Sequence, residues 1–358
     1  MCEDISYDGR ALSNIEVNME ILKKNEYKKL TGILAKHSID MDLLKNKLIN
    51  LKKIIVICGP TGIGKSKLGI SISGFLDTDI ISVDSMQVYK GMNIGTDKIN
   101  TENYGIKQYM VDIFEPDHKL SVMEFKNTAK NIINKEFIKS RKIPLMVGGS
   151  GLYVRAIIDD LDKGPGEDRK FRKALEDDIK KNGSKKHYNK LLKIDNEYAL
   201  KISENDSRRI IRALEVFHFS GIPFSQFQKA WNRKADCEVT FIGLNKDRSQ
   251  LYLDIEKRVE DMFDSGLVKE VKCLIEQGYK ESFSLKQAVG YKEVIDHIEG
   301  KTDLAKCKDE VKKNSRRLAK KQMTWFGRDS RINWIRVDNY DNMFDLIIDT
   351  LKIIDGEL

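Results

Sequence analysis

The chain has 358 residues, of which 33% are charged, and its 63 basic residues exceed its 55 acidic residues to give a net charge of +8. No apolar run approaches the roughly 18 residues of a membrane-spanning helix, so we expect a soluble protein without membrane contact. The positive charge fits either a polyanionic partner or a well-solvated surface. Five scattered cysteines, without a C-x-x-C, indicate neither a disulfide framework nor a zinc site, and cytoplasm is the expected compartment.

The first 50 residues precede the first predicted strand. Apolar residues at helical spacing in residues 15–22 and 43–51 predict short helices. We therefore interpret residues 1–50 as an N-terminal helical extension, to which the sequence assigns no role.

Residues 53–70 combine a buried-strand pattern, a glycine-rich turn and the opening of a helix. Within them GPTGIGKS, residues 59–66, matches the phosphate-binding pattern G-x-x-x-x-G-K-[ST]. In such a loop the backbone N–H groups at a helix N-terminus bind phosphate oxygens. Lys65 adds a positive charge, and the Ser66 hydroxyl is placed to bind Mg²⁺. The stretch predicts a site for a diphosphate or a triphosphate.

A second short buried strand, residues 79–83, ends at Asp84. The carboxyl ends of parallel strands beside such a loop are where open α/β sheets bind ligands. Asp84 is therefore a candidate acid or base, although an N-cap would suit the same position. Gly95, Thr96 and Lys98 offer further hydrogen-bond donors near this crevice.

The next pattern predicts a strand at residues 109–114, a helix at residues 121–142 and a strand at residues 143–147. The last strand runs into Gly148 to Gly151. A P-loop NTPase normally ends the equivalent strand in an acidic residue that helps to hold Mg²⁺. The small residues found here make ordinary ATP hydrolysis less favoured.

Residues 161–236 are densely charged and helical in pattern, and strand patterning returns only at residues 238–244. Three arginines share one helix face in this stretch and Arg172 lies upstream; they suit a solvated face or a phosphate backbone equally well. Later helices carry Arg258 and a basic run, residues 312–321, that precedes Trp325 and Phe326. We expect an α/β fold with a P-loop parallel-sheet core, residues 51–160 and 237–345, flanked by helices and interrupted by an all-helical insertion domain.

Six motifs occur in order between residues 54 and 334 and together closely resemble the tRNA dimethylallyltransferases, also called tRNA isopentenyltransferases: GPTGIGKS, SVDSMQVYKGMNIGT, IPLMVGGSGLYVRAI, NDSRRIIRALEVF, AVGYKE and RRLAKKQMTWF. That family transfers a dimethylallyl group to N6 of adenosine 37, next to the tRNA anticodon. The chain departs from the family pattern at Ser150, where threonine is usual, and at residues 107–110, KQYM, where a His-His-Leu is common.

The resemblance implies roles for individual residues. Asp84 would be the general base at the adenine amino group, and Thr61 and Arg258 would assist the departure of diphosphate. Dimethylallyl diphosphate, with Mg²⁺ on Ser66, would be bound by Gly59, Pro60, Thr61, Gly62, Ile63, Gly64, Lys65 and Ser66. The anticodon stem-loop of tRNA would contact Asp84, Ser85, Met86, Gln87, Ser150, Arg172, Arg208, Arg209 and Arg212. We expect a monomer.

Three alternatives share the phosphate loop. An adenylate isopentenyltransferase would modify free AMP, ADP or ATP. Relatives of that type lack most of the helical tRNA-binding part, so the insertion at residues 161–226 with its arginines favours tRNA as the substrate. A nucleotide or metabolite kinase would transfer phosphate and not use dimethylallyl diphosphate. An RNA-binding protein with a degenerate P-loop is disfavoured because Lys65, Ser66 and Asp84 are all present.

Overall fold

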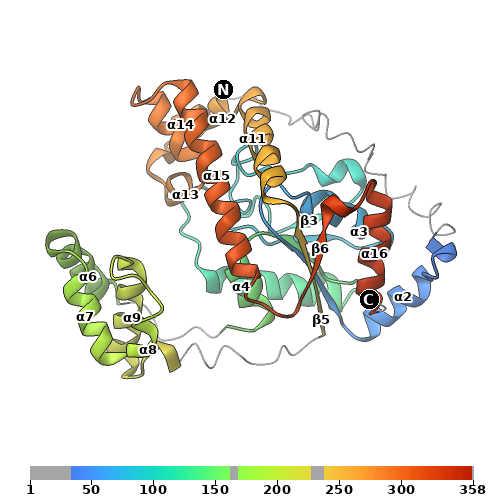
Figure 1. The fold of residues 1–358 in the computed structure, drawn as a ribbon, viewed down its shortest axis with the longest axis horizontal. Coiled ribbons are helices and arrows are strands. Elements are labelled where there is room, and N and C mark those ends of the chain that lie inside the picture. The colour runs from blue at the N-terminus through green and yellow to red at the C-terminus, as the bar shows by residue number, and fades with distance from the viewer. Residues whose placement is uncertain (1–33, 162–167, 227–237, 357–358) are drawn as a thin grey trace. The chain divides into compact units, whose positions relative to one another are not determined.

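The computed structural model describes residues 34–161, 168–226 and 238–356 (Figure 1). The chain separates into two compact units. The larger unit comprises Met1–Val154 and Asp236–Leu358, and the smaller unit comprises Arg155–Ala235. The sequence predicts its helical insertion at residues 161–236. Of the predicted N-terminal extension, residues 1–33, including the helix expected at 15–22, lie outside the described residues.

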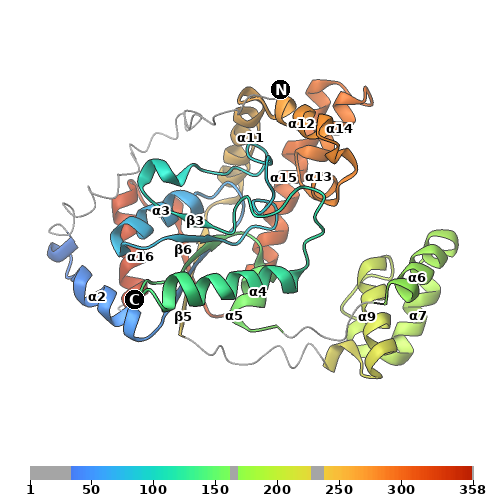
Figure 2. The ribbon, with the colours of Figure 1, turned by 180° about the vertical axis from the view of Figure 1, so that it is seen from behind.

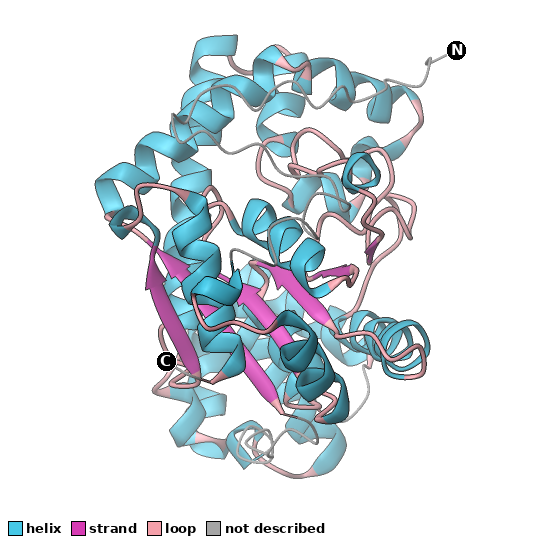
Figure 3. Cartoon of the chain, turned by 90° about the vertical axis from the view of Figure 1, so that its right-hand side faces the viewer, coloured by secondary structure: helices cyan, strands magenta, loops and turns pink. Residues whose placement is uncertain are grey.

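Within the described residues, the sheet of the larger unit has six parallel strands in the order β3-β2-β4-β1-β5-β6. They are β1 (Ile54–Cys58), β2 (Ile80–Ser82), β3 (Gln108–Tyr109), β4 (Leu145–Gly148), β5 (Val239–Asn245) and β6 (Ile332–Arg336). Figure 3 shows strands of this sheet in magenta, with helices around them. Strand β1 is buried along its whole length, which explains its unbroken apolar sequence. The expected α/β class with a parallel sheet is confirmed.

Parallel register brings the carboxyl ends of the central strands to one edge of the sheet. Cys58, the last residue of β1, is level with Gly148 of β4 and with Gly243 of β5. Ser82 of β2 is level with Val147 of β4. The loops that follow these strands therefore begin side by side, at the edge where such sheets bind ligands.

Helices cover both faces of the sheet. On one face α2 (Met41–Asn50), α3 (Lys65–Leu76) and α16 (Met343–Asp355) share a hydrophobic core with Ile55 and Ile57 of β1. On the other side, α4 (Val122–Ile132) runs across the sheet, as the view from behind shows (Figure 2). Ser121 caps α4 by accepting a hydrogen bond from the Glu124 N–H, as the S-x-x-E pattern of the sequence indicates.

A group of helices follows β5 and precedes β6. Ion pairs join the first and the longest of them, Arg316 to Glu256 and Lys312 to Glu260, which fixes α11 and α15 against each other. The group comprises α11 (Arg248–Asp264), α12 (Leu267–Glu276), α13 (Phe283–Gln287), α14 (Tyr291–Ile298) and α15 (Leu304–Phe326). These helices lie beyond one end of the sheet, as Figure 1 shows.

Two predicted elements differ from the structure. The predicted strand at residues 109–114 is wrong beyond Tyr109, because Met110 and Asp112 adopt left-handed φ values of 64° and 53° that end the extended chain. Only an isolated bridge between Phe114 and Tyr89 follows. The helix predicted at residues 121–142 becomes a π-helical segment at Ile133–Ile138, which an apolar periodicity cannot distinguish from α-helix.

The smaller unit consists of α6 (Arg169–Asn182), α7 (Lys185–Ile194), α8 (Asn196–Ala199) and α9 (Ser207–Ser220) in its described part. It has a hydrophobic core of its own that includes Leu175, Leu191, Tyr198, Ile210 and Leu214. The boundary between the two units falls within helix α5 (Gly151–Ile158). Across the described residues, no helix combines the length and the apolar character needed to cross a membrane.

Candidate active site

The predicted phosphate loop connects β1 to α3 and opens onto a cavity of about 550 Å³. Gly62 and Gly64 have φ values of 79° and 92°, which glycine adopts without strain. The loop leads directly into the first turn of α3, whose free N–H groups and helix dipole favour the binding of an anion. The cavity is lined from this loop by Thr61, Gly62, Ile63, Gly64, Lys65 and Ser66.

The first two residues of the motif, Gly59 and Pro60, support the loop and do not line the cavity. Both are buried. A Cβ on Gly59 would lie 2.7 Å from the Leu244 carbonyl oxygen, so only glycine lets the loop pass so close to β5. The Pro60 carbonyl oxygen accepts a hydrogen bond from Lys65 Nζ at 2.6 Å. These two residues therefore shape the loop around the lysine.

The surroundings of Lys65 lower the pKa of its ammonium group. Burial, with the nearby positive charge of Arg258, lowers the pKa of Lys65 from 10.5 to about 8. Below this pH the side chain is charged and attracts an anion; above it the charge is lost.

We therefore expect the affinity for inorganic pyrophosphate to decrease above pH 8, by at most about tenfold per pH unit. Isothermal titration between pH 7 and pH 9.5 measures the effect. A Lys65→Met variant binds more weakly and should lack the Lys65-dependent part of this decrease. If the wild type and the variant follow the same pH profile, Lys65 does not titrate in this range.

Asp84 follows β2 and lines the same cavity. Its Oδ1 accepts a hydrogen bond from the Met86 N–H at 2.8 Å, so the carboxylate does cap its own turn. Within the described residues no hydrogen bond reaches its Oδ2. The capping role and a role toward a ligand are therefore compatible, because one oxygen orients the group and the other remains available.

The other residues expected around Asp84 lie close by. Met86 and Gln87 line the cavity, whereas the Ser85 N–H donates to Ser150 Oγ at 3.2 Å. The Ser150 hydroxyl thus joins the loop after β4 to the loop after β2. Gln87 in turn accepts a hydrogen bond from Ser82 Oγ at 2.7 Å.

The glycines after β4 have a steric function. A Cβ on Gly148 would lie 2.1 Å from the Val83 carbonyl oxygen, and one on Gly149 would lie 2.3 Å from Gln322 Nε2. Small residues are therefore needed at the end of β4 for Val83 and for Gln322 of α15 to approach it. The strand end accordingly carries no acidic side chain, as the sequence shows.

Arg258 of α11 reaches the phosphate loop from 197 residues away. Its Nη1 donates a hydrogen bond to the Thr61 hydroxyl, and its Nε lies 3.4 Å from Asp97 Oδ2. This Nε is buried and makes no hydrogen bond within the described residues. A guanidinium with a spare donor beside the P-loop fits an anionic ligand in the cavity. The structure thus brings together Thr61, Lys65, Asp84 and Arg258.

Sequence reasoning missed Gln322, whose Oε1 accepts the Thr61 N–H at 2.8 Å. It lies in the motif RRLAKKQMTWF, but nothing in that motif indicated a contact with the phosphate loop. The expectation for Lys98 was wrong. Its ammonium is buried and bonded to the Tyr89 carbonyl oxygen at 2.6 Å and to Asp112 at 2.6 Å, so it stabilises a turn instead of facing the crevice.

The four arginines expected at tRNA all belong to the smaller unit. Arg172 and Arg212 both bind the fully buried carboxylate of Glu215, at 2.6 Å and 2.9 Å. Arg208 and Arg209 are exposed at the start of α9, where Arg209 lies 3.4 Å from Asp206. Arg172 and Arg212 therefore bind a buried carboxylate, whereas Arg208 and Arg209 face solvent.

The donors of the cavity fit Mg²⁺ in a limited way. Among the described residues, no group of three or more His, Cys, Asp or Glu side chains could hold a metal ion. Ser66 and Asp84 nevertheless line one cavity. Mg²⁺ often takes only one or two protein ligands and completes its shell with water and substrate phosphates, so this donor set is sufficient for it.

Comparison with known proteins gives a consistent result. The sequence profile of the family described as IPP transferase matches residues 87–329. A tRNA dimethylallyltransferase of Thermoanaerobacter sp. (strain X514) is 42% identical over 311 residues, which is 86% of this chain and 98% of the relative. That of Carboxydothermus hydrogenoformans is 45% identical over 286 residues, 79% of this chain and 91% of the relative.

Two solved structures resemble the fold. The tRNA isopentenylpyrophosphate transferase of Bacillus halodurans superposes with a TM-score of 0.64 at 36% identity, covering 85% of this chain and 96% of that one. A eukaryotic dimethylallyltransferase captured acting on tRNA gives a TM-score of 0.70 at 26% identity, covering 85% and 80%. The profile match over most of the chain and relatives of this identity and coverage show that the protein belongs to the IPP transferase family.

Proposed function

We propose that the protein transfers a dimethylallyl group from dimethylallyl diphosphate to N6 of adenosine 37 in tRNA, releasing diphosphate. Family membership supports the reaction type. The observation that carries it in this chain is the shared cavity, in which Lys65, Arg258 and the α3 N-terminus face the same space as Asp84. Such a site can bind an anionic leaving group on one side and, on the other, an amine that gives its proton to Asp84.

The diphosphate side would stabilise the leaving group. As the bond between the allylic carbon and the diphosphate oxygen breaks, negative charge grows on that oxygen and positive charge on the carbon. Preorganised donors aimed at the developing negative charge lower the barrier. Thr61, Lys65 and Arg258 supply them here, with the free N–H groups of α3. Mg²⁺ bound through Ser66 and the phosphate oxygens would add Lewis-acid stabilisation.

The nucleophile side would be organised by Asp84. A neutral exocyclic amine is a weak nucleophile, and a carboxylate within hydrogen-bond reach orients it and accepts a proton as the new bond forms. The N6–carbon bond forms, the carbon–oxygen bond breaks, and the N6 proton passes to Asp84. The base must first leave the anticodon loop, at a cost of a few kcal/mol that is lowest for an unpaired base.

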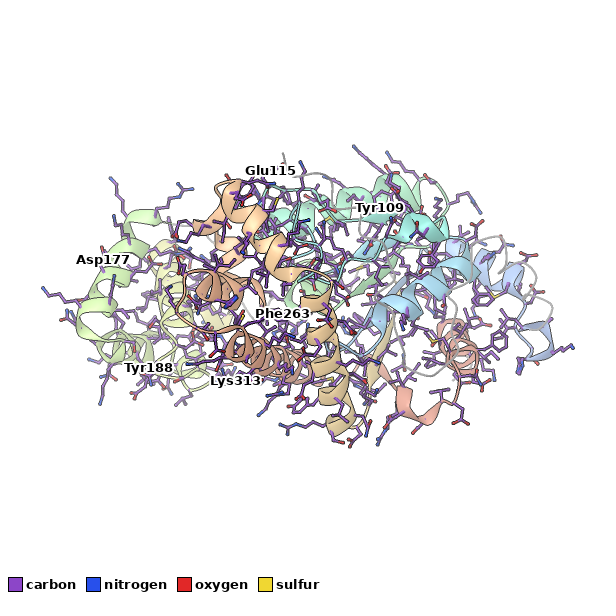
Figure 4. All side chains as sticks on the ribbon, turned by 90° about the horizontal axis from the view of Figure 1, so that it is seen from above. Tyr109, Glu115, Asp177, Tyr188, Phe263 and Lys313 are labelled. Atoms are coloured by element: carbon purple, nitrogen blue, oxygen red, sulfur yellow. The ribbon has the colours of Figure 1, made fainter. Side chains whose placement is uncertain are left out.

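A basic surface beside the cavity supports an RNA substrate. In the first half of α15, Lys312 pairs with Glu260 at 2.5 Å, and Lys313, labelled in Figure 4, pairs with Glu310 at 2.8 Å. In the second half, the exposed Lys320 and Lys321 form no ion pair within the described residues. The same half carries Trp325, 37% exposed, which packs where a Cβ on Gly151 would clash at 2.7 Å. Cations interleaved with an exposed aromatic suit phosphates and unstacked bases.

In the smaller unit, the exposed Arg208 and Arg209 of α9 are proposed RNA contacts. We expect Arg208→Ala and Arg209→Ala each to weaken tRNA binding and to reduce the slope of log affinity against log salt by about 1. Lys201→Ala is the matched control in the same unit, because Lys201 is an exposed cation that lies outside α9 and pairs with Glu197 at 3.0 Å. Filter binding at several salt concentrations measures both. If the arginine variants bind tRNA as the control does, α9 is not part of the RNA-binding surface.

A free-nucleotide substrate is the second candidate. It would use the same phosphate loop and Asp84, but it would leave the exposed arginines of α9 and the unpaired cations of α15 without a function. We further expect a monomer working in the cytoplasm on the anticodon stem-loop. Nucleoside analysis of an unmodified stem-loop after incubation with dimethylallyl diphosphate and Mg²⁺ tests the proposal: a modified adenosine should form, and a stem-loop with guanosine at position 37 should yield none. Product from both stem-loops would contradict the assignment of the target base.

A further inference from the structure

A buried carboxylate on α12 holds one wall of the cavity. Glu270 is 6% exposed, and its Oε2 accepts hydrogen bonds from the N–H groups of Asn93 at 3.0 Å and Ile94 at 2.8 Å. Its Oε1 lies 3.4 Å from the Gly95 nitrogen and accepts the Tyr291 hydroxyl at 2.6 Å. Within the described residues no lysine or arginine forms an ion pair with it. Peptide N–H groups and one phenol therefore take the place of water around this carboxylate.

Tyr291 fits against the same loop. It is fully buried at the first position of α14, and a Cβ on Gly95 would lie 2.3 Å from its ring. Only glycine at this position allows the ring and its hydroxyl to reach Glu270. Burial raises the pKa of Tyr291, and Glu270 raises it further, so the phenol remains a hydrogen-bond donor. The loop is thus held by the carboxylate and by the packing of the ring.

The held loop contributes Ile94, Gly95, Thr96 and Asp97 to the cavity wall. On one side, the Thr96 carbonyl oxygen accepts a hydrogen bond from Gln87 Nε2 at 3.1 Å. Gln87 lies three residues after Asp84 and lines the cavity as well. The loop therefore fixes the segment that carries the proposed general base.

On the other side, the loop reaches the phosphate-binding residues. Asp97 Oδ2 lies 3.4 Å from Arg258 Nε, and Arg258 donates to the Thr61 hydroxyl. Glu270 itself does not line the cavity. It is connected through one loop to both halves of the site, although nothing in the proposed chemistry requires it to touch a substrate.

We propose that Glu270 is a positioning residue of the transfer reaction, which sets the spacing between the Arg258 side and the Asp84 side of the cavity by holding the loop at residues 93–97. This inference rests on the proposed function. Its physical basis is that reacting groups must be held close to their productive geometry, since a displacement of about 1 Å can reduce a rate by roughly 10²-fold.

The variant Glu270→Gln keeps the size of the side chain but replaces one acceptor oxygen with a donor that faces the Gly95 N–H. We expect kcat for tRNA modification to fall by roughly 10²-fold, with a smaller rise in the KM for dimethylallyl diphosphate and little change in the KM for tRNA. Glu293→Gln is the matched control. Glu293 also accepts a backbone N–H, from Gly290 at 2.8 Å, but it caps α14 and holds no cavity residue. The variant Glu293→Gln should lose as much thermal stability as Glu270→Gln but retain the wild-type kcat.

Two further readouts do not depend on turnover. Hydrogen exchange should accelerate at the amides of residues 93–95 in Glu270→Gln and not in Glu293→Gln, and the affinity for inorganic pyrophosphate should fall only in the former. If Glu270→Gln does not fold, Tyr291→Phe replaces it and should lower kcat several-fold with faster exchange at Gly95. Equal kcat in Glu270→Gln and the wild type, or equal losses in the two glutamine variants, would overturn the inference. A wild type without transfer activity would instead refute the proposed function, while the exchange and pyrophosphate results would still test Glu270.

Discussion

Asp84→Asn is expected to reduce kcat for dimethylallyl transfer by roughly 10²- to 10⁴-fold, the contribution of a general base. The amide keeps the oxygen that accepts the Met86 N–H, so the turn after β2 should remain intact. What it loses is the proton-accepting capacity of the second oxygen. Because Asp84 would act on the amine and not on the RNA backbone, the affinity for tRNA should change little.

Single-turnover kinetics with preformed tRNA complex separate the chemical step from binding. The exposed Asp117 offers a control, since Asp117→Asn makes the same chemical change away from the cavity lining and should keep its rate. If Asp84→Asn turns over at the wild-type rate, this carboxylate is not the base, and its role is limited to capping the turn.

Arg258→Ala should lower kcat by roughly 10²- to 10³-fold, as expected when one donor to a developing negative charge is removed. The change leaves the Thr61 hydroxyl and Asp97 without their shared partner. Arg258→Lys should restore only part of the rate, because an ammonium group is a point charge and cannot reproduce the planar fork of the guanidinium. Steady-state kinetics with saturating tRNA measure both variants.

The same substitution has a second consequence that tests the electrostatics directly. Arg258 is one of the groups that lower the pKa of Lys65, so its removal should move the pH-dependent loss of pyrophosphate affinity upward from about pH 8. Arg248→Ala is the control on the same helix, where the side chain is exposed and bonded to the Tyr252 hydroxyl at 2.9 Å. Identical pH profiles for Arg258→Ala and the wild type would show that the two cations do not interact.

The parts of the fold that the sequence predicted are the local ones. The apolar run before GPTGIGKS, the strand ending at Asp84 and the strand ending at Gly148 each carry their pattern within a few residues, and each lies in the sheet as expected. The convergence of Thr61, Lys65 and Asp84 follows from parallel strands sharing one edge. The prediction of the third strand was wrong beyond Tyr109 because Met110 and Asp112 have left-handed φ values, which no apolar pattern indicates.

The contacts that sequence reasoning missed are mainly the long-range ones. Gln322 meets Thr61 across 261 residues, and Glu270 meets Ile94 across 176 residues. Pattern and spacing indicate which face of a helix is apolar, but not which loop its polar residues will contact after packing. Arg172 is a further long-range case, because its pairing with the buried Glu215 of α9 arises only when α6 packs against α9. The Arg212–Glu215 pair, three residues apart on α9, is local and was missed all the same.

The most direct test of the proposed function is the destination of a labelled dimethylallyl group. The protein, Mg²⁺ and labelled dimethylallyl diphosphate are incubated with unmodified tRNA and with AMP and ATP in one tube, and the products are separated by size. We predict label on tRNA alone, at the adenosine next to the anticodon, with none in the Asp84→Asn variant on the same timescale. Label on the free nucleotides, or on neither acceptor, would contradict the account.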